Sequence, residues 1–188
     1  MKIAYLRLGA IETEQGNYEK GIEYFEKVLE FDPKNVDAYS LMGRAQALMD
    51  QIKLSRKTYE KILNINHYDS YALCAVGNIN LIYGRSDPNK PAVSFFILFF
   101  FIIQLLILVI HCLPIKLYIL IFFFVVFVVI LQKEAYYKRA VELFDKALIL
   151  DNQNIYAANG IAIALAERGY VDIAKNLFIQ VFKINKIK

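Results

Sequence analysis

The sequence of 188 residues predicts an all-α fold, a solenoid of about four helical hairpins interrupted by one long apolar helical segment or hairpin. Three observations lead to this prediction. Residues of matching type recur every 34 positions, and each repeat has the apolar spacing of two amphipathic helices. In addition, the 40 residues of 93–132 contain a single charged side chain, Lys116. Stacked helical hairpins commonly repeat at periods of this size.

The 34-residue period is present on both sides of the apolar block. Gly9, Gly43 and Gly77 follow one another at this spacing, and Phe144 and Phe178 repeat it after the block. The other pairs at the same spacing are Tyr5 and Tyr39, Phe25 and Tyr59, Val28 and Ile62, Ala140 and Ala174, and Ala147 and Val181. So many coincidences at one period predict a tandem repeat.

The first unit, 2–35, has the pattern of two helices joined by a tight turn. Apolar and small residues fall at helical spacing on both sides of a Gly16-Asn17 break. Gly9 is expected to let the two helices approach closely, and Phe25 is expected to fill the layer between successive hairpins. Pro33 ends the unit because proline is accepted only at the start of a helix.

The later units follow in order and divide the chain into three parts. Unit two covers 36–69, and unit three begins at Ser70 and resumes after the block as Ala135–Leu150. Unit four begins at Ile155. The predicted domains are 2–91, with units one and two and the first helix of unit three; 93–132, the apolar insert; and 133–183, with the second helix of unit three and unit four.

The apolar block has two interpretations, and both stay open. Val93–Ile110 has the length of a membrane span, whereas Leu117–Leu131 is short for one. However, the block splits a repeat unit, and codons for Phe, Ile, Leu and Val all carry thymine at the second position, as in a thymine-rich intron read in frame. Val93-Ser94 and Gln132 can be encoded by intron donor and acceptor sequences. We therefore favour a translated intron for 93–132, and the tail 182–188 allows the same explanation.

The repeat resembles the tetratricopeptide repeat (TPR), a helical hairpin of about 34 residues. Unit four is more specific, because Tyr156-Ala157-Ala158-Asn159-Gly160-Ile161 is followed by Arg168-Gly169-Tyr170. This stretch is similar to one segment of the large TPR subunit of the RNA polymerase II-associated factor complex, which acts in transcription elongation. The resemblance implies a nuclear scaffold, here an internal fragment, that binds other protein subunits, associates indirectly with RNA polymerase II and supports histone modification. If 93–132 is truly translated, the alternative is a membrane-anchored TPR adaptor that displays its repeats to the cytosol.

The sequence contains no recognisable catalytic, metal-binding or nucleic-acid-binding motif. The two cysteines and two histidines lack zinc-site spacing, and a formal net charge of +4 without a basic run gives little support to direct nucleic-acid binding. His67 is expected to be a surface turn residue and Cys74 a packing residue. The sequence therefore predicts no enzyme activity, no catalytic residue, no cofactor and no metal.

Protein binding remains as the expected function. The first helices of TPR hairpins line a concave face that holds peptides or partner helices. The predicted groove residues are Asp37, Ser40, Arg44, Tyr71, Asn78, Tyr156, Asn159 and Ile163. Phe178 and Val181 are expected to face the place of a missing neighbouring repeat, which would make the isolated chain prone to aggregation.

Overall fold

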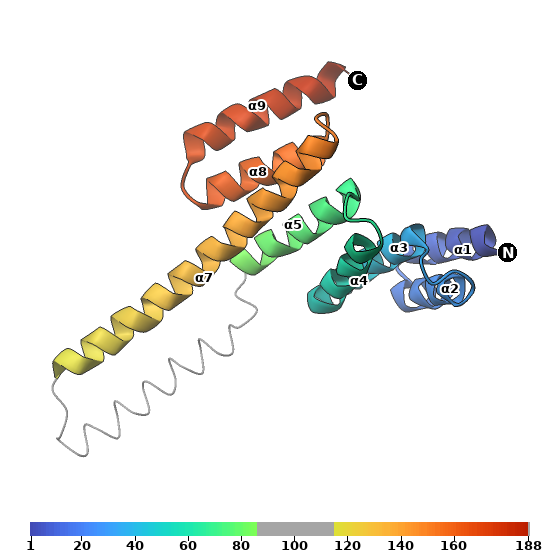
Figure 1. Ribbon diagram of the computed structural model, residues 1–188, viewed down its shortest axis with the longest axis horizontal. Helices are drawn as coiled ribbons and strands as arrows, with labels where there is room; N and C mark the ends of the chain where they lie inside the picture. Colours follow the sequence, from blue (N-terminus) through green and yellow to red (C-terminus); the bar gives the residue numbers. More distant parts are fainter. Residues whose placement is uncertain (86–114, 188) are drawn as a thin grey trace, which may run out of the picture. The chain divides into compact units, whose positions relative to one another are not determined.

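The computed structural model describes residues 1–85 and 115–187, and every regular element in these ranges is an α-helix (Figure 1). The chain divides into two compact units, Met1–Ile79 with Ala140–Lys188, and Asn80–Arg139. The predicted all-α fold is confirmed. The helices are α1 (Lys2–Glu14), α2 (Tyr18–Phe31), α3 (Val36–Leu48), α4 (Ile52–Ile65), α5 (Ser70–Arg85), α7 (Ile115–Leu150), α8 (Ile155–Glu167) and α9 (Val171–Ile187).

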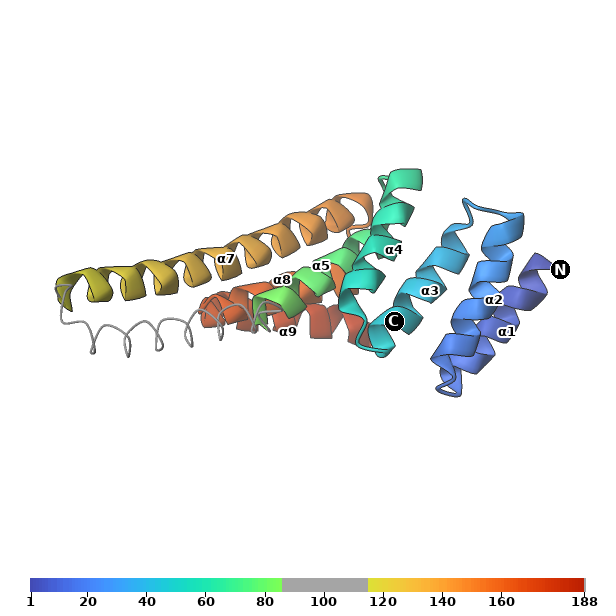
Figure 2. The ribbon, with the colours of Figure 1, turned by 90° about the horizontal axis from the view of Figure 1, so that it is seen from below.

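Within the compact unit formed by Met1–Ile79 and Ala140–Lys188, consecutive helices pair as hairpins. Helix α1 packs on α2, α3 on α4, and α8 on α9, and α2 also contacts α3 of the following hairpin (Figure 2). A Cβ atom added at Gly9 would lie 2.5 Å from the Phe25 ring, and one added at Gly43 would lie 2.9 Å from the Tyr59 ring. The helices can approach this closely because these two positions have no side chain.

The third hairpin pairs segments on opposite sides of the apolar block. Gly77 of α5 faces Phe144 of α7, and an added Cβ would lie 2.8 Å from the ring. Phe144 is fully buried and also lies against Gly160 of α8, where an added Cβ would lie 2.4 Å away. The end of α7 therefore lies against both α5 and α8 at this ring, and its assignment as the second helix of unit three stays a prediction. Within the compact unit Asn80–Arg139, Gly84 and Tyr137 form the same kind of contact. A Cβ atom added at Gly84 would lie 2.7 Å from the Tyr137 ring.

The turns between hairpins end in the same helix cap. The side-chain oxygen of Asn35 accepts a hydrogen bond from the Ala38 amide, and this bond measures 2.9 Å. Asp69 and Asn154 occupy the equivalent positions and cap α5 and α8 through the amides of Ala72 (2.8 Å) and Ala157 (3.0 Å). Such caps satisfy backbone N–H groups that have no partner in the first turn of a helix.

Helix α7 is 36 residues long and runs without a break through the second part of the apolar block. Its Phe123 and Phe124 side chains are each 65% exposed, and Phe127 is 57% exposed. In the two described ranges, no helix is both long and apolar enough to span a membrane. The predicted run 93–110 lies outside the described residues, so the predicted insert boundaries at 93 and 132 stay a prediction.

Candidate protein-binding surface

Three of the predicted groove residues share one face of α3. Asp37, Ser40 and Arg44 are spaced by three and four residues, which places them above one another on a helix. Asp37 and Arg44 are exposed and Ser40 is half-buried. This helix therefore presents a polar face with one acidic and one basic side chain.

The other predicted residues lie on the equivalent helices of the later hairpins. Tyr71 and Asn78 are both exposed on α5, seven residues apart and hence on one face. On α8, Tyr156 is 80% exposed, while Asn159 and Ile163 are half-buried on the same face. Helices α3, α5 and α8 thus each present polar or aromatic groups to solvent. The assembly of these groups into one groove stays a prediction.

The structure brings three of these residues together around Tyr59 of α4. The Tyr59 hydroxyl donates a hydrogen bond of 3.4 Å to the backbone carbonyl of Ser40. Its ring packs edge-to-face on Tyr71 of α5, with ring centroids 6.1 Å apart. Burial raises the pKa of the Tyr59 hydroxyl, Tyr71 adds to the rise, and the Arg44 guanidinium opposes it. Tyr59 therefore joins α3, α4 and α5 directly beneath the candidate surface.

Cys74 lies in the core rather than on this surface. Its side chain is only 7% exposed, and its Sγ donates a weak hydrogen bond of 3.9 Å to Oδ1 of Asn154. Burial raises the pKa of the thiol to about 11. A thiol that stays protonated near neutral pH is a poor nucleophile, in keeping with the expected packing role.

Asn154 is a residue that the sequence analysis did not single out. It caps α8 and also accepts from the Cys74 thiol, so it connects α5 to the start of α8. Its position in the repeat matches that of Asn35, and this equivalence is the signal that could have identified it as a cap. His67 is exposed in the turn after α4, where Nδ1 pairs with the Leu63 carbonyl. Within the part of the chain that the structure describes, no cluster of His, Cys, Asp or Glu is arranged to hold a metal ion.

A second surface lies outside the predicted set of groove residues. It is an open groove of about 1060 Å³ along α9, with Ala166 of α8 at one side. Phe178 is 36% exposed and Phe182 is 69% exposed, while Val181 is half-buried. The sequence had indicated that Phe178 would face outward, but it did not identify the groove. The apolar residues that line it are Ala166, Val171, Ala174, Phe178, Ile179 and Phe182.

Comparison with known proteins places these features in context. Residues 3–35, which contain most of the first hairpin, match the tetratricopeptide repeat family. The chain is 29% identical over 180 residues to Protein CTR9 homolog of Arabidopsis thaliana, an alignment that covers 95% of this chain and 13% of the relative. It is 23% identical over 181 residues to RNA polymerase-associated protein CTR9 of Caenorhabditis elegans, with 94% and 12% covered. The chain therefore spans only a small part of the length of these relatives.

A solved structure shows the same fold at much lower identity. The crystal structure of a thermophilic TPR protein from Thermus thermophilus superposes with a TM-score of 0.67, at 12% identity, over 99% of this chain and 75% of that one. At this identity the likeness concerns the fold alone. The fold of the chain is a TPR-like α-solenoid, and its sequence resembles one stretch of the CTR9 proteins.

Proposed function

We propose that the chain is a protein-interaction scaffold and a fragment of a TPR subunit of an RNA polymerase II-associated transcription elongation complex. The observation that carries this proposal is the similarity to CTR9 proteins over 94–95% of the chain. One of these relatives, from C. elegans, is named as RNA polymerase-associated. The proposed location is the nucleus. The proposed partners are the other protein subunits of the complex, with an indirect link to RNA polymerase II, no direct contact with nucleic acid and support for histone modification.

The exposed face of the first helices is the proposed contact surface. Arg44 and Tyr156 are exposed on α3 and α8. Beneath that face, Tyr59 holds α3 and α5 together through its hydrogen bond to the Ser40 carbonyl and its ring contact with Tyr71. A rigid face that carries exposed aromatic and charged groups suits an extended peptide or a helix of another subunit. Aromatic and Arg side chains of this kind frequently dominate the binding energy of an interface.

Immunoprecipitation tests this proposal. The full chain, tagged and expressed in nuclei of the source organism, should co-precipitate with RNA polymerase II and the subunits of its elongation complex. Arg44→Glu combined with Tyr156→Ala should lower recovery of those subunits at least about tenfold, because hot-spot residues each contribute about 2 kcal/mol or more. Lys57→Glu, at an exposed position of α4, is the matched control and should leave recovery unchanged.

Two results would reject the proposal. One is the absence of polymerase and complex subunits from the precipitate of the unmodified chain. The other is equal loss of subunits with the control and the double variant, which would show that the first-helix face is not the contact. Depletion of the protein should also reduce histone ubiquitination and methylation on immunoblots, and unchanged histone marks would contradict the histone-modification part of the proposal.

The second candidate function is a membrane-anchored TPR adaptor. The observation in its favour is the exposure of apolar side chains on α7, where Phe123, Phe127 and Ile130 are all more than half exposed. RNA sequencing across codons 91 to 133 separates the two candidates. Transcripts without codons 93–132 would exclude the adaptor. Transcripts that retain them, with a protein that fractionates with membranes, would favour it over the nuclear scaffold.

A further inference from the structure

Helices α5 and α8 differ from α2 and α4 in the kind of side chain that they expose. Among the 16 residues of α5 and the 13 of α8, the charged ones are Arg85 and Glu167, each the last residue of its helix. By contrast, 6 of the 14 residues of α2 and 5 of the 14 of α4 are charged. The exposed residues of α5 and α8 ahead of these ends are Tyr71, Asn78, Ile82 and Tyr156. Both helices therefore present aromatic, amide and aliphatic groups to solvent where α2 and α4 present charges.

The exposed faces of α5 and α8 belong to one compact unit, and contacts link the two helices. The Cys74 thiol of α5 bonds to Asn154, which caps α8, and the Phe144 ring lies against glycines of both helices. Tyr71 and Tyr156 are each the second residue of their helix and hold the same place in the repeat. They therefore lie on the same side of their hairpins.

The exposed groups suit an extended segment better than a helix. The side-chain amides of Asn78 and Asn159 each offer hydrogen-bond donors and an acceptor. An extended peptide presents free backbone N–H and C=O groups to such amides, whereas a helix has already paired its own. Tyr71 is 51% exposed and Tyr156 is 80% exposed, so both rings offer apolar surface to side chains of the same segment.

The absence of charge on these two faces selects an uncharged segment. A Lys or Glu side chain placed against α5 ahead of Arg85, or against α8 ahead of Glu167, would lose water without meeting an opposite charge on that helix. The charge-free area ends at α3, where Asp37 and Arg44 are exposed. Depletion of charged residues and enrichment of tyrosine are typical of the buried centre of protein interfaces.

We propose that the exposed face of α5 and α8 binds an extended, charge-free segment of a partner subunit. Aliphatic side chains or proline of this segment lie against Tyr71 and Tyr156, and its backbone amides pair with Asn78 and Asn159. The proposal rests on the proposed function, because it names the chemistry that the scaffold's contact surface takes. The two fail separately: co-precipitation tests the complex, and synthetic peptides test the chemistry of the face without any other subunit.

Three fluorescein-labelled peptides of about twelve residues, about 40 Å long when extended, test this proposal on the full chain. All three alternate Val or Pro with a variable residue, which is Ser in the neutral peptide, Glu in the acidic one and Lys in the basic one. Fluorescence anisotropy should give the neutral peptide a Kd at least about tenfold lower than either charged peptide, because burial of an unpaired charge is unfavourable. This Kd should change less than about twofold between low and high salt, since no charge pair contributes to it. Equal Kd values, tighter binding of a charged peptide, or no binding would overturn the proposal.

Matched substitutions locate the bound peptide. Tyr156→Glu adds a charge to the face and should weaken binding of the neutral peptide at least about tenfold. Ile149→Glu adds the same charge at a position of similar exposure near the end of α7 (83% against 80%) and should leave the Kd unchanged. Asn78→Asp keeps the shape of the side chain but removes its donors, so it should also weaken binding, whereas Asn64→Asp at an exposed position of α4 should not. Equal effects within either pair would contradict binding at α5 and α8.

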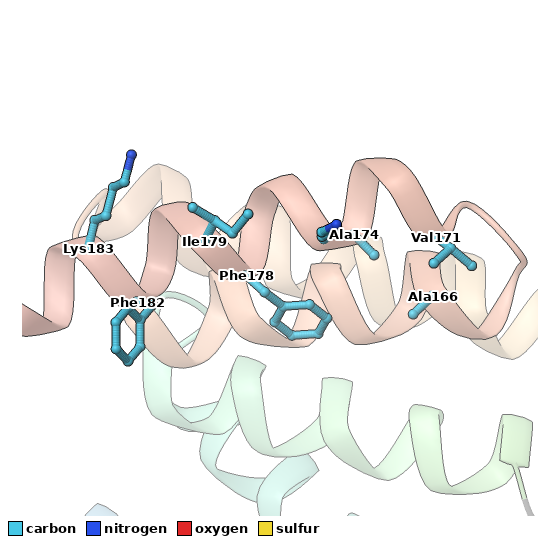
Figure 3. Close-up of a pocket in the computed structure, with 8 residues that line it drawn as sticks. Ala166, Val171, Ala174, Phe178, Ile179, Phe182 and Lys183 are labelled. Carbon is cyan, nitrogen blue, oxygen red and sulfur yellow. The ribbon is translucent and has the colours of Figure 1, made fainter.

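The apolar groove of α9 is the other described surface on which a neutral peptide can lie. Phe178 and Phe182 project from the same side of α9 (Figure 3), and Ile179 beside them is 45% exposed. Ile179→Asp should leave the Kd of the neutral peptide unchanged, because the proposed site lies on α5 and α8. Loss of binding with Ile179→Asp but not with Tyr156→Glu would place the peptide on α9 and overturn the proposal.

Discussion

A glycine on the first helix and an aromatic ring on the second form the central contact in each of the first three hairpins. The pairs are Gly9 with Phe25, Gly43 with Tyr59, and Gly77 with Phe144. All three rings are buried, so each pair combines a close backbone approach with a large amount of apolar surface removed from water. A methyl group in place of the glycine hydrogen would overlap the ring in every case.

Gly9→Ala tests this contact because two opposing effects can be weighed. Alanine is favoured over glycine inside a helix by about 1 kcal/mol. The new Cβ would, however, lie 2.5 Å from the Phe25 ring, and overpacking of this kind costs about 1–3 kcal/mol. We expect a net decrease in the free energy of unfolding, measured by urea denaturation. A Phe25→Leu background should turn Gly9→Ala neutral or stabilising, and an equal loss in both backgrounds would show that the ring is not the cause.

The buried thiol of Cys74 makes stability depend on pH in the alkaline range. Its pKa is raised to about 11 in the folded chain, whereas an unfolded cysteine has a pKa of about 8.5. Between these values the unfolded chain loses the proton and the folded chain keeps it, so the stability contributed by the neutral thiol is present below pH 8.5 and is lost as pH rises towards 11. In a Cys112→Ser background, unfolding free energies should fall more steeply over this range with Cys74 than with Cys74→Ala. Identical slopes would contradict burial of the thiol.

Residue-level sequence analysis succeeded where the same residue type recurs at the period of the repeat. The glycines and aromatic rings could be identified because both members of each pair recur at one period. Ser55, in contrast, was not singled out by the spacing of the repeat. In the structure its hydroxyl donates a buried 2.7 Å hydrogen bond to the Gly43 carbonyl, so serine has a stabilising role there. That role depends on the distance between two helices, which spacing alone does not supply.

At the scale of elements, helix starts were easier to predict than the extent of α7. Asn35, Asp69 and Asn154 cap their helices in the same way. The residue two positions before the cap is Pro33 in the first turn but His67 and Asn152 in the later ones, so the cap does not depend on proline. Helix α7 extends through residue 132 because no glycine or proline lies between Ile115 and Leu150 to end it. The sequence analysis divided this stretch by composition, and composition does not terminate a helix.

The two halves of α7 should contribute unequally to stability. Phe144 is fully buried between Gly77 and Gly160, and Phe→Ala at buried sites costs about 3–5 kcal/mol. Phe127 is 57% exposed, so Phe127→Ala should change the free energy of unfolding by less than about 0.5 kcal/mol. Urea denaturation of both variants measures the difference. Comparable losses would mean that the apolar half of α7 belongs to the folded core.

At the scale of the whole molecule, the repeats could be predicted from the sequence but the candidate surfaces only in part. The first-helix face follows from the repeat architecture, which fixes the side of each hairpin on which Arg44 and Tyr156 lie. The groove on α9 depends on the exposure of Phe178, Ile179 and Phe182, and exposure is a property of the assembled helices. Nothing in the spacing of these residues distinguishes an uncovered stripe from a buried one.

The apolar block offers the sharpest test of the fold as a whole, because the repeats predict that it is dispensable. The contact between Gly84 and Tyr137 brings the end of α5 close to the part of α7 that follows the block. Deletion of 93–132 leaves the seven residues 86–92 to join Arg85 to Lys133, and such a segment can span about 23 Å when extended. The shortened chain should therefore keep the hairpin of α5 with 133–150. It should also lose the exposed apolar surface of Phe123, Phe124 and Phe127.

The expected result is an unchanged or higher Tm by circular dichroism and less aggregation by size-exclusion chromatography. Phe144→Ala serves as the internal control, because it should cost the same about 3–5 kcal/mol in the shortened chain if the contact with Gly77 and Gly160 is retained. Loss of cooperative unfolding on deletion would show that residues 93–132 support the solenoid. A small effect of Phe144→Ala in a folded, shortened chain would show that the third hairpin had re-formed in another register.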